Sequence, residues 1–329
     1  MPVRPHFQKL VERARRLPPL PAAVVFPCDR DALQGALSAV FAGCLAPTFV
    51  GPETRIRDVA SHAGLDISRL PVVDTADDPR QASTVAAHLA RDGRVAALVK
   101  GSLTSEEMLG PVAAADSGLR TGSRLTHAYF VDVAAAPRGL VLTDAQLNVN
   151  PNLAAKRDIV HNAVQLAQAL GTEEPRVALL AAIDGLSASF RSTADAAALK
   201  SMAQQGLFGR ALVDGPVTPD SALVPELARL RGLAGEVAGN ADVLMAPSME
   251  TAVMVVRTML ALGNALAAGV VLGARVPIVA WRHQDPIEVR VAGCVLACLV
   301  HAARSPAAPA APPPAATASS AGVPARAAA

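Results

Sequence analysis

Short apolar runs alternate with longer amphipathic segments along most of the chain. Each run holds three to five residues and ends near Gly, Pro or Asp, a pattern typical of buried strands. The longer segments repeat apolar residues at helical spacing, for example at 7–17, 31–42 and 81–92. The runs predict strands at 22–26, 47–50, 71–74, 96–99, 139–142, 176–180, 211–213, 243–245 and 277–279. This alternation predicts an α/β fold built on a doubly wound, largely parallel sheet.

The number of predicted strands exceeds that of one small sheet, so we expect two α/β/α lobes with a cleft between them. Residues 7–143 and 281–304 are expected in the first lobe, and residues 144–280 in the second. The apolar stretch at 261–280 has the length of a membrane span, but Gly, Asn, Arg and Pro interrupt it. We interpret it as a helix followed by a strand. Residues 305–329 are rich in Ala and Pro and are predicted to be disordered.

Composition narrows the possible classes of function. Hydrophobic residues make up 51% of the chain and aromatic residues 3%, so a core of Ala, Val and Leu is expected. The net charge is only +2 and no stripe of basic residues is present, so electrostatics give no reason to expect nucleic-acid binding. Cys294 and Cys298 lie four apart on an expected apolar helix and are interpreted as buried thiols rather than metal ligands. Because no apolar leader begins the chain, we expect a soluble cytoplasmic protein with no membrane partner.

Polar residues follow several of the predicted strands. Lys100 and Ser102 come directly after one strand, where a cation and free N–H groups can bind an anion. The alternative for Ser102 is that it caps the next helix. Arg120 and Arg124, with His127 nearby, suit phosphate because guanidinium binds phosphate oxygens in a bidentate way. A solvated loop is the alternative there.

Four further candidates lie at or soon after the ends of later strands, namely Asn148, Asp214, Asp220 and Glu250. Helix capping and ordinary turn chemistry are the alternatives for these residues. Open α/β sheets bind ligands beyond the carboxyl ends of their strands. We therefore expect all the candidates to converge on one cleft.

The last predicted strand runs into a polar loop. Arg282, His283 and Asp285 crowd this loop, at the place where an open α/β sheet puts its chemistry. The only tryptophan of the chain, Trp281, stands at the start of the loop. We expect the three polar residues to belong to the site.

Together these segments resemble the phosphate acetyltransferase/phosphate butyryltransferase family. Residues 99–102 are similar to the family's Met-Lys-Gly-Ser, and residues 118–121 to its Gly-Leu-Arg-Thr. Residues 143–151 resemble Thr-Asp-Ala-Ala-Ile-Asn-Ile-Ala-Pro, and residues 192–197 resemble Ser-Thr-x-Asp-Ala-Ala. The similarity extends in one register over roughly residues 7–303 and is greatest to the short, single-module branch of the family.

The resemblance implies two α/β lobes like those of isocitrate and isopropylmalate dehydrogenases, a homodimer, and a cleft that binds coenzyme A. It also implies reversible acyl transfer between acyl-CoA and inorganic phosphate, with both as substrates and no permanently bound cofactor. In the family the loop aspartate is the general base, the loop serine contacts the CoA sulfur, and the loop arginine holds the acyl phosphate. The aspartate falls on Asp285, and the cleft residues fall on the candidates named above.

The loop itself departs from the family pattern. Where the family has Thr-Ser-Arg-Ala-Asp, this chain has Trp-Arg-His-Gln-Asp, so Asp285 alone matches. We expect Arg282 or His283 to contact the acyl phosphate, and Trp281 either to pack between the lobes or to stack on adenine. A second hypothesis also stays open, in which the chain is a catalytically impaired or re-specified relative. Such a protein would bind CoA or acyl phosphate as a sensor or partner subunit.

Overall fold

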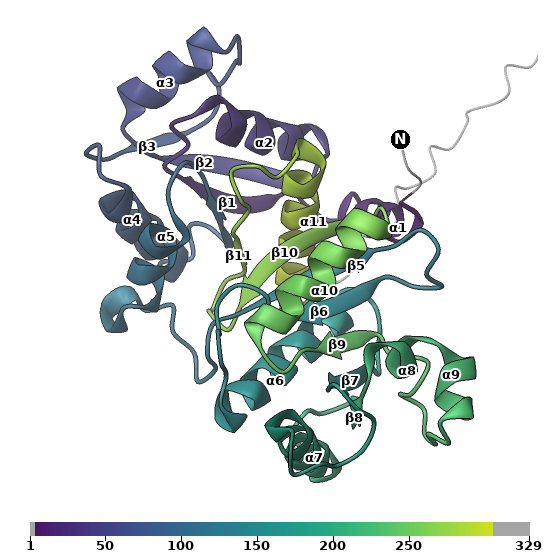
Figure 1. Cartoon of the computed structure of the whole chain (residues 1–329). Helices are drawn as coiled ribbons and strands as arrows, with labels where there is room; N and C mark the ends of the chain where they lie inside the picture. Colours follow the sequence, from purple (N-terminus) through teal and green to yellow (C-terminus); the bar gives the residue numbers. More distant parts are fainter. Residues whose placement is uncertain (1–3, 305–329) are drawn as a thin grey trace, which may run out of the picture.

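The computed structural model describes residues 4–304, and the tail predicted to be disordered lies outside them. Within the described chain the strands form one mixed sheet in the order β3-β2-β1-β4-β11-β10-β5-β6-β9-β7-β8 (Figure 1). The strands are β1 (Leu20–Val25), β2 (Leu45–Gly51), β3 (Val72–Asp74), β4 (Ala97–Lys100), β5 (Thr126–Asp132), β6 (Leu140–Thr143), β7 (Arg176–Leu180), β8 (Leu212–Val217), β9 (Val243–Met245), β10 (Leu266–Leu272) and β11 (Ile278–Val279). The helices are α1 (Pro5–Ala14), α2 (Arg30–Phe41), α3 (Glu53–His62), α4 (Pro79–Arg91), α5 (Ser105–Ala113), the 3-10 turn η1 (Ala115–Ser117), α6 (Leu153–Ala169), α7 (Arg191–Gln204), α8 (Pro219–Leu223), α9 (Pro225–Leu230), α10 (Met249–Leu262) and α11 (Ile287–Arg304). This mostly parallel sheet flanked by helices confirms the predicted α/β class.

One half of the sheet is a parallel block. β3, β2, β1, β4 and β11 all run in the same direction. Val24 and Leu98 are fully buried in it, as expected for parallel strands that lie between two layers of helices. The carboxyl ends of β1, β4 and β11 therefore meet at one edge of the sheet, and this edge carries the residues that follow those strands.

Two antiparallel strands in the middle of the sheet, β5 and β10, were not predicted. They pair along their whole length, from Leu266 opposite Asp132 to Leu272 opposite Thr126. A helix was predicted for the first part of the apolar stretch 261–280. This prediction was wrong for Leu266–Leu272, which form β10. An Ala-rich run buried on both faces has no periodicity that separates strand from helix. These two strands join the two halves into one sheet.

The other half of the sheet runs in the opposite direction. β6 is antiparallel to β5, and β9, β7 and β8 are parallel to β6. The two halves are offset along the strands, so that Thr143 at the end of β6 is level with Ala128, Val270, Val279 and Val99. The carboxyl ends of β6, β9 and β7 therefore lie level with those of β4 and β11. The expectation that the candidates meet at one cleft stays a prediction, because the register brings the strand ends of both halves to the same level of the sheet.

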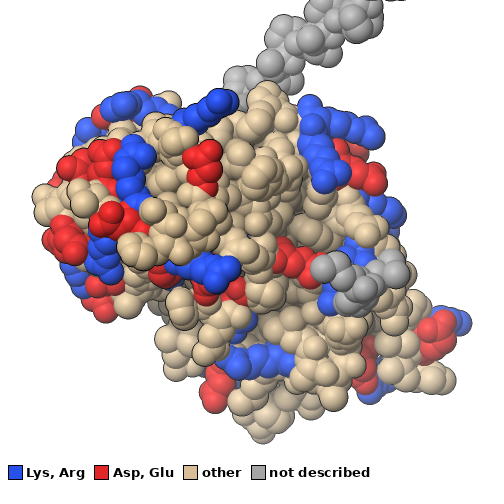
Figure 2. All heavy atoms as spheres, turned by 90° about the horizontal axis from the view of Figure 1, so that it is seen from above, with Lys and Arg blue, Asp and Glu red and all other residues tan. Residues whose placement is uncertain are grey.

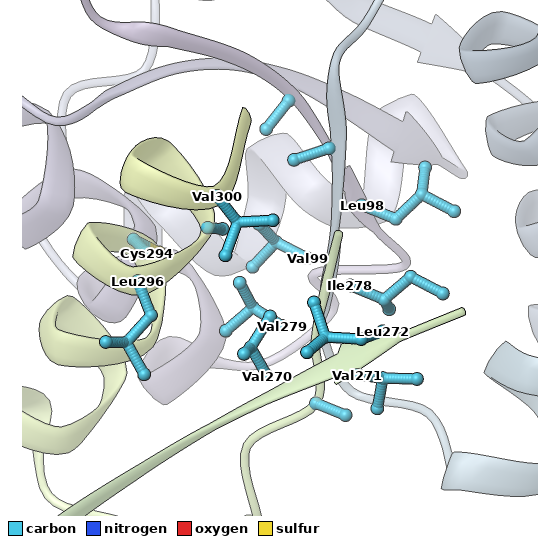
Figure 3. Close-up of a cluster of buried hydrophobic side chains, with 14 of the residues drawn as sticks. Leu98, Val99, Val270, Val271, Leu272, Ile278, Val279, Cys294, Leu296 and Val300 are labelled. Atoms are coloured by element: carbon cyan, nitrogen blue, oxygen red, sulfur yellow. The ribbon is translucent and has the colours of Figure 1, made fainter. Parts of the chain in front are cut away.

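Helices cover both faces of the sheet. α11 packs on β10, β11, β1 and β4, with α1, α2 and α6 beside it, and α10 lies on the opposite face over β6 and β10 (Figure 1). Figure 3 shows Cys294 and Leu296 of α11 close to Val270 and Val279 of the sheet. α4 packs against β1, β2 and β4, and α5 packs on α4. The site residues lie where these layers meet the strand ends.

Two simpler expectations also meet the structure. Cys294 and Cys298 are buried in α11, as predicted. Among residues 4–304 no helix is both long and apolar enough to cross a bilayer. On the face shown in Figure 2, basic and acidic side chains are interspersed rather than separated, which agrees with the small net charge.

Candidate active site

The loop after β11 holds the three loop candidates. The backbone N–H of Arg282 donates to Asp285 Oδ2 at 2.8 Å, and its Nε and Nη2 lie 3.1 and 3.0 Å from Asp285 Oδ1. The Asp285 side chain is 11% exposed, whereas that of Arg282 is 45% exposed. His283 Nδ1 lies 3.9 Å from Oδ2 of Asp29, the N-cap residue of α2. The loop thus presents a partly exposed cation over a nearly buried carboxylate.

The carboxyl end of β4 contributes a buried cation to the same region. Lys100 is 8% exposed, and burial lowers the pKa of its ammonium group, helped by the positive charge of Arg290. The carboxylates of Asp29 and Asp285 act in the opposite direction. Lys100 therefore lies within electrostatic reach of the loop carboxylate.

Ser102 carries a hydroxyl that no protein group uses. Its Oγ is buried and has no hydrogen-bond partner among the described residues. The capping alternative does not apply, because Thr104 caps α5 and its hydroxyl accepts from Glu107 N at 3.2 Å. A Cβ at Gly101 would lie 2.3 Å from Val25 O, so only glycine lets this turn pass so close to β1. The turn therefore holds an unpaired hydroxyl close to the carboxyl end of β4.

Two rings of β5 also respond to the charges of the loop. Burial lowers the pKa of His127 from 6.5 to about 4, against the opposing carboxylate of Asp144. Burial raises the pKa of Tyr129, whose ring meets that of His127 edge to face at 4.4 Å between centroids. Arg282 lowers both pKa values through its charge. His127 is therefore a neutral, buried base whose Nδ1 has no partner in the described chain.

A cavity of about 820 Å³ lies between α5 and the loop that follows β6. Arg120 and Arg124 are exposed and line it, together with Asn148. The amide of Asn148 donates to Asp144 Oδ2 at 2.6 Å and to Leu125 O at 3.0 Å. Ser105, at the start of α5, lines the cavity as well. The cavity thus lies along α5 and is bounded by the arginine loop and by the loop after β6.

Three further predicted residues lie on β8, α8 and α10. Asp214 lies within β8 rather than after a strand, and it pairs with Lys200. β8 is six strand spacings from β11, or about 30 Å at the usual distance between strands. Arg231 Nη2 binds Asp220 Oδ2 at 2.6 Å. Glu250 is exposed in the first turn of α10. Within one chain Asp214 is therefore far from Asp285.

Two residues near the loop were missed from the sequence. Asp29 follows β1 and faces His283, and Arg290 of α11 donates to the loop carbonyls of Asp285 and His283 at 3.0 and 2.8 Å. The signal for Asp29 was its place in the turn after a strand. The signal for Arg290 was a charged residue next to the long apolar run of the same helix.

Comparison with known proteins gives a consistent result. The family model described as phosphate acetyl/butaryl transferase matches residues 80–282. A phosphate acetyltransferase of Rhizobium meliloti is 41% identical over 298 residues, which cover 91% of this chain and 94% of that protein. A phosphate butyryltransferase of Clostridium beijerinckii is 32% identical over 297 residues, which cover 90% of this chain and 98% of that protein.

Solved structures show the same fold. A phosphotransacetylase from Streptococcus pyogenes superimposes with a TM-score of 0.77 at 17% identity, covering 89% of this chain and 98% of that one. A branched-chain phosphotransacylase from Enterococcus faecalis gives a TM-score of 0.75 at 22% identity, covering 86% of this chain and 99% of that one. At these identities the likeness speaks for the fold alone.

Proposed function

Since the chain belongs to the phosphate acetyl/butyryl transferase family and is a phosphate acyltransferase, we propose that the loop Trp281–Asp285 is its reaction centre. The observation that carries the proposal is the contact between Arg282 and Asp285, with Lys100 in electrostatic reach. A carboxylate and two cations beside one another suit a reaction in which a thiol loses a proton and an anion is held.

The chemistry follows from the groups present. Toward acyl-CoA, Asp285 takes the proton of the CoA thiol, and the thiolate attacks the carbonyl carbon of the acyl phosphate. The C–S bond forms, the C–O bond to phosphate breaks, and phosphate leaves. In the reverse direction a phosphate oxygen attacks the thioester carbon and the thiolate leaves with the proton from Asp285. Arg282 and Lys100 stabilise the negative charge on the phosphate.

We assign the 820 Å³ cavity to the coenzyme, because its volume is within the usual range for ligand sites. Arg120 and Arg124 are exposed on its wall, where guanidinium groups can pair with the phosphates of CoA. Ser105, three residues after Ser102, lines the cavity as well. The thiol end of CoA then points toward Asp285 while the phosphorylated end meets the arginines.

Assembly and location are also parts of this proposal. The proposed lobes, 7–143 with 281–304 and 144–280, place the loop and the cavity near their boundary. Met254 and Leu262 on the outer face of α10 are 60% and 85% exposed, which supports association of two copies through this helix. A cytoplasmic location agrees with the use of acyl-CoA as substrate.

The test is release of free thiol from acetyl-CoA and butyryl-CoA, with and without phosphate. Phosphate-dependent release is expected, and the ratio of the two rates gives the acyl preference. No release from either thioester, in folded protein that binds CoA, would contradict catalysis at this loop and favour a role as a sensor or partner subunit.

A further inference from the structure

We propose that Arg290 is the positioning residue of the reaction: it sets the shape of the loop Trp281–Asp285 without touching substrate. This inference rests on the proposed reaction centre. Arg290 lies in the first turns of α11 and is 3% exposed, so its guanidinium is held inside the protein.

One guanidinium fixes two points of the loop. Arg290 Nε donates to Asp285 O at 3.0 Å, and Nη2 donates to His283 O at 2.8 Å. The two carbonyls belong to the residues on either side of Gln284. The guanidinium therefore holds the backbone immediately before and at Asp285. Because the guanidinium is planar, both bonds constrain the loop at once. A lysine at this position has a single nitrogen and cannot reproduce that geometry.

The position of Arg290 is itself determined by two neighbours. Its Cζ lies 5.3 Å from the centre of the Trp281 ring, in a cation–π contact. On the other side, a Cβ at Gly35 of α2 would lie 2.8 Å from Arg290 Cδ. Because Gly35 has no side chain, the methylene groups of Arg290 can pass close to α2 at this point. α2, α11 and the loop thus meet around the Arg290 side chain.

The arrangement has a consequence for the reaction. Asp285 is bound through its carboxylate by Arg282 and through its carbonyl by Arg290. A shift of the carbonyl would move the carboxylate away from the thiol, and a displacement of about 1 Å is enough to reduce turnover by about 100-fold. Substrate binding in the cavity would change little, since Arg120 and Arg124 belong to another loop.

The test compares Arg290→Lys and Gly35→Ala with wild type and with a control, Arg138→Met. Arg138 lies in the turn between β5 and β6. Like Arg290 it donates to a backbone carbonyl, in this case that of Asn240 at 2.7 Å. Turnover is measured at saturating acyl-CoA and phosphate. Because Trp281 is the only tryptophan of the chain, its fluorescence and its quenching by acrylamide report the loop independently of activity.

Arg290→Lys is expected to lower kcat by about 10- to 100-fold with less than about threefold change in KM for acyl-CoA. It is also expected to make Trp281 more accessible to acrylamide. Gly35→Ala should shift both readouts in the same direction, although alanine favours the helix that contains it. Arg138→Met should change neither readout.

The outcomes separate the inference from the proposed function. If wild type releases no thiol, the proposed function fails, and the Trp281 readout still tests the role of Arg290. If wild type is active but Arg290→Lys keeps both its kcat and its Trp281 quenching, the positioning role is overturned. An equal fall of kcat in Arg138→Met would likewise overturn it, because the loss would then reflect general destabilisation.

Discussion

Arg282 occupies both oxygens of the Asp285 carboxylate. Its backbone N–H binds Oδ2 at 2.8 Å, while its Nε and Nη2 bind Oδ1 at 3.1 and 3.0 Å. A general base needs a free lone pair that faces the proton it removes. Arg282 is the more exposed partner of the pair. In the proposed reaction, phosphate competes for its guanidinium, and anion binding is thereby coupled to release of the carboxylate.

Replacing Asp285 with Asn tests the base directly. The amide keeps the size of the side chain and one acceptor oxygen, but it cannot take a proton from the thiol. We expect kcat in the direction of acyl-CoA formation to fall by about 100-fold or more, since general bases typically contribute this much. The midpoint of urea unfolding and the affinity for CoA serve as controls. A rate within twofold of wild type would rule out Asp285 as the base.

Replacing Arg282 with Gln tests whether this side chain holds phosphate. The change removes the charge but retains a hydrogen-bonding amide. KM for phosphate should rise about tenfold or more, because charge-assisted bonds to phosphate are the stronger ones. KM for acyl-CoA should stay within about threefold, as the coenzyme is assigned to the cavity. Arg57→Gln, which alters an exposed pair with Glu53, is the matched control. A uniform change in both KM values would contradict the assignment.

Ser102→Ala should separate activity from stability. The hydroxyl is buried and unpaired in the described chain, so its removal costs no protein hydrogen bond. We expect the free energy of unfolding to stay within about 0.5 kcal/mol of wild type or to rise slightly. Turnover should fall by about tenfold or more if the hydroxyl donates to the substrate. Urea denaturation and thiol release on the same preparations decide the matter; a variant that loses stability but not turnover would assign Ser102 a structural role.

His127 should make the fold sensitive to mild acid. Its pKa falls from 6.5 to about 4 on folding because it is buried, so below pH 6.5 the unfolded chain binds a proton that the folded chain does not. The stabilisation is complete above pH 6.5 and is lost as the pH falls from 6.5 toward 4. Between pH 7.5 and pH 5 the free energy of unfolding should drop by about 2 kcal/mol from this group.

The His127→Phe variant provides the comparison. Its ring can keep the packing against Tyr129 but has no titrating nitrogen. Urea unfolding at pH 7.5 and at pH 5 should show a smaller loss of stability in the variant than in wild type. An identical loss in both proteins would show that other groups cause the acid sensitivity.

The ion pair between Lys156 and Asp195 predicts a large effect on stability. Lys156 Nζ lies 2.7 Å from Asp195 Oδ2, and the two side chains are 6% and 13% exposed. Lys156→Met leaves a buried carboxylate without its main partner and should cost about 3 kcal/mol of unfolding free energy. The control Arg229→Met removes an exposed pair with Glu226 and should change the value by less than about 1 kcal/mol. Adding Asp195→Asn to Lys156→Met should recover part of the loss; no recovery would point to lost packing instead.

The predictions from the sequence succeed where a short apolar run has clear boundaries. β7 and β9 begin and end at the predicted residues, and β1 and β4 differ by one or two positions. β5 and β10 were missed because strands buried on both faces have no alternation to recognise. Lys100, Arg282 and Asp285 were named from their places after strands, and the structure brings them together. Arg290 was missed because its role depends on carbonyls that only the folded loop presents.

The sequence by itself determined the α/β class, the family, and the residue types available for chemistry, since these follow from local pattern and from motifs in one register. It did not determine strand direction. Strand order was open as well: β8 lies six strand spacings from β11, which places Asp214 about 30 Å from the loop. Nor did it determine that Gly35 makes room for Arg290 or that Arg282 covers Asp285. Those relations depend on contacts between segments distant in the chain, and only the packed tertiary structure sets them.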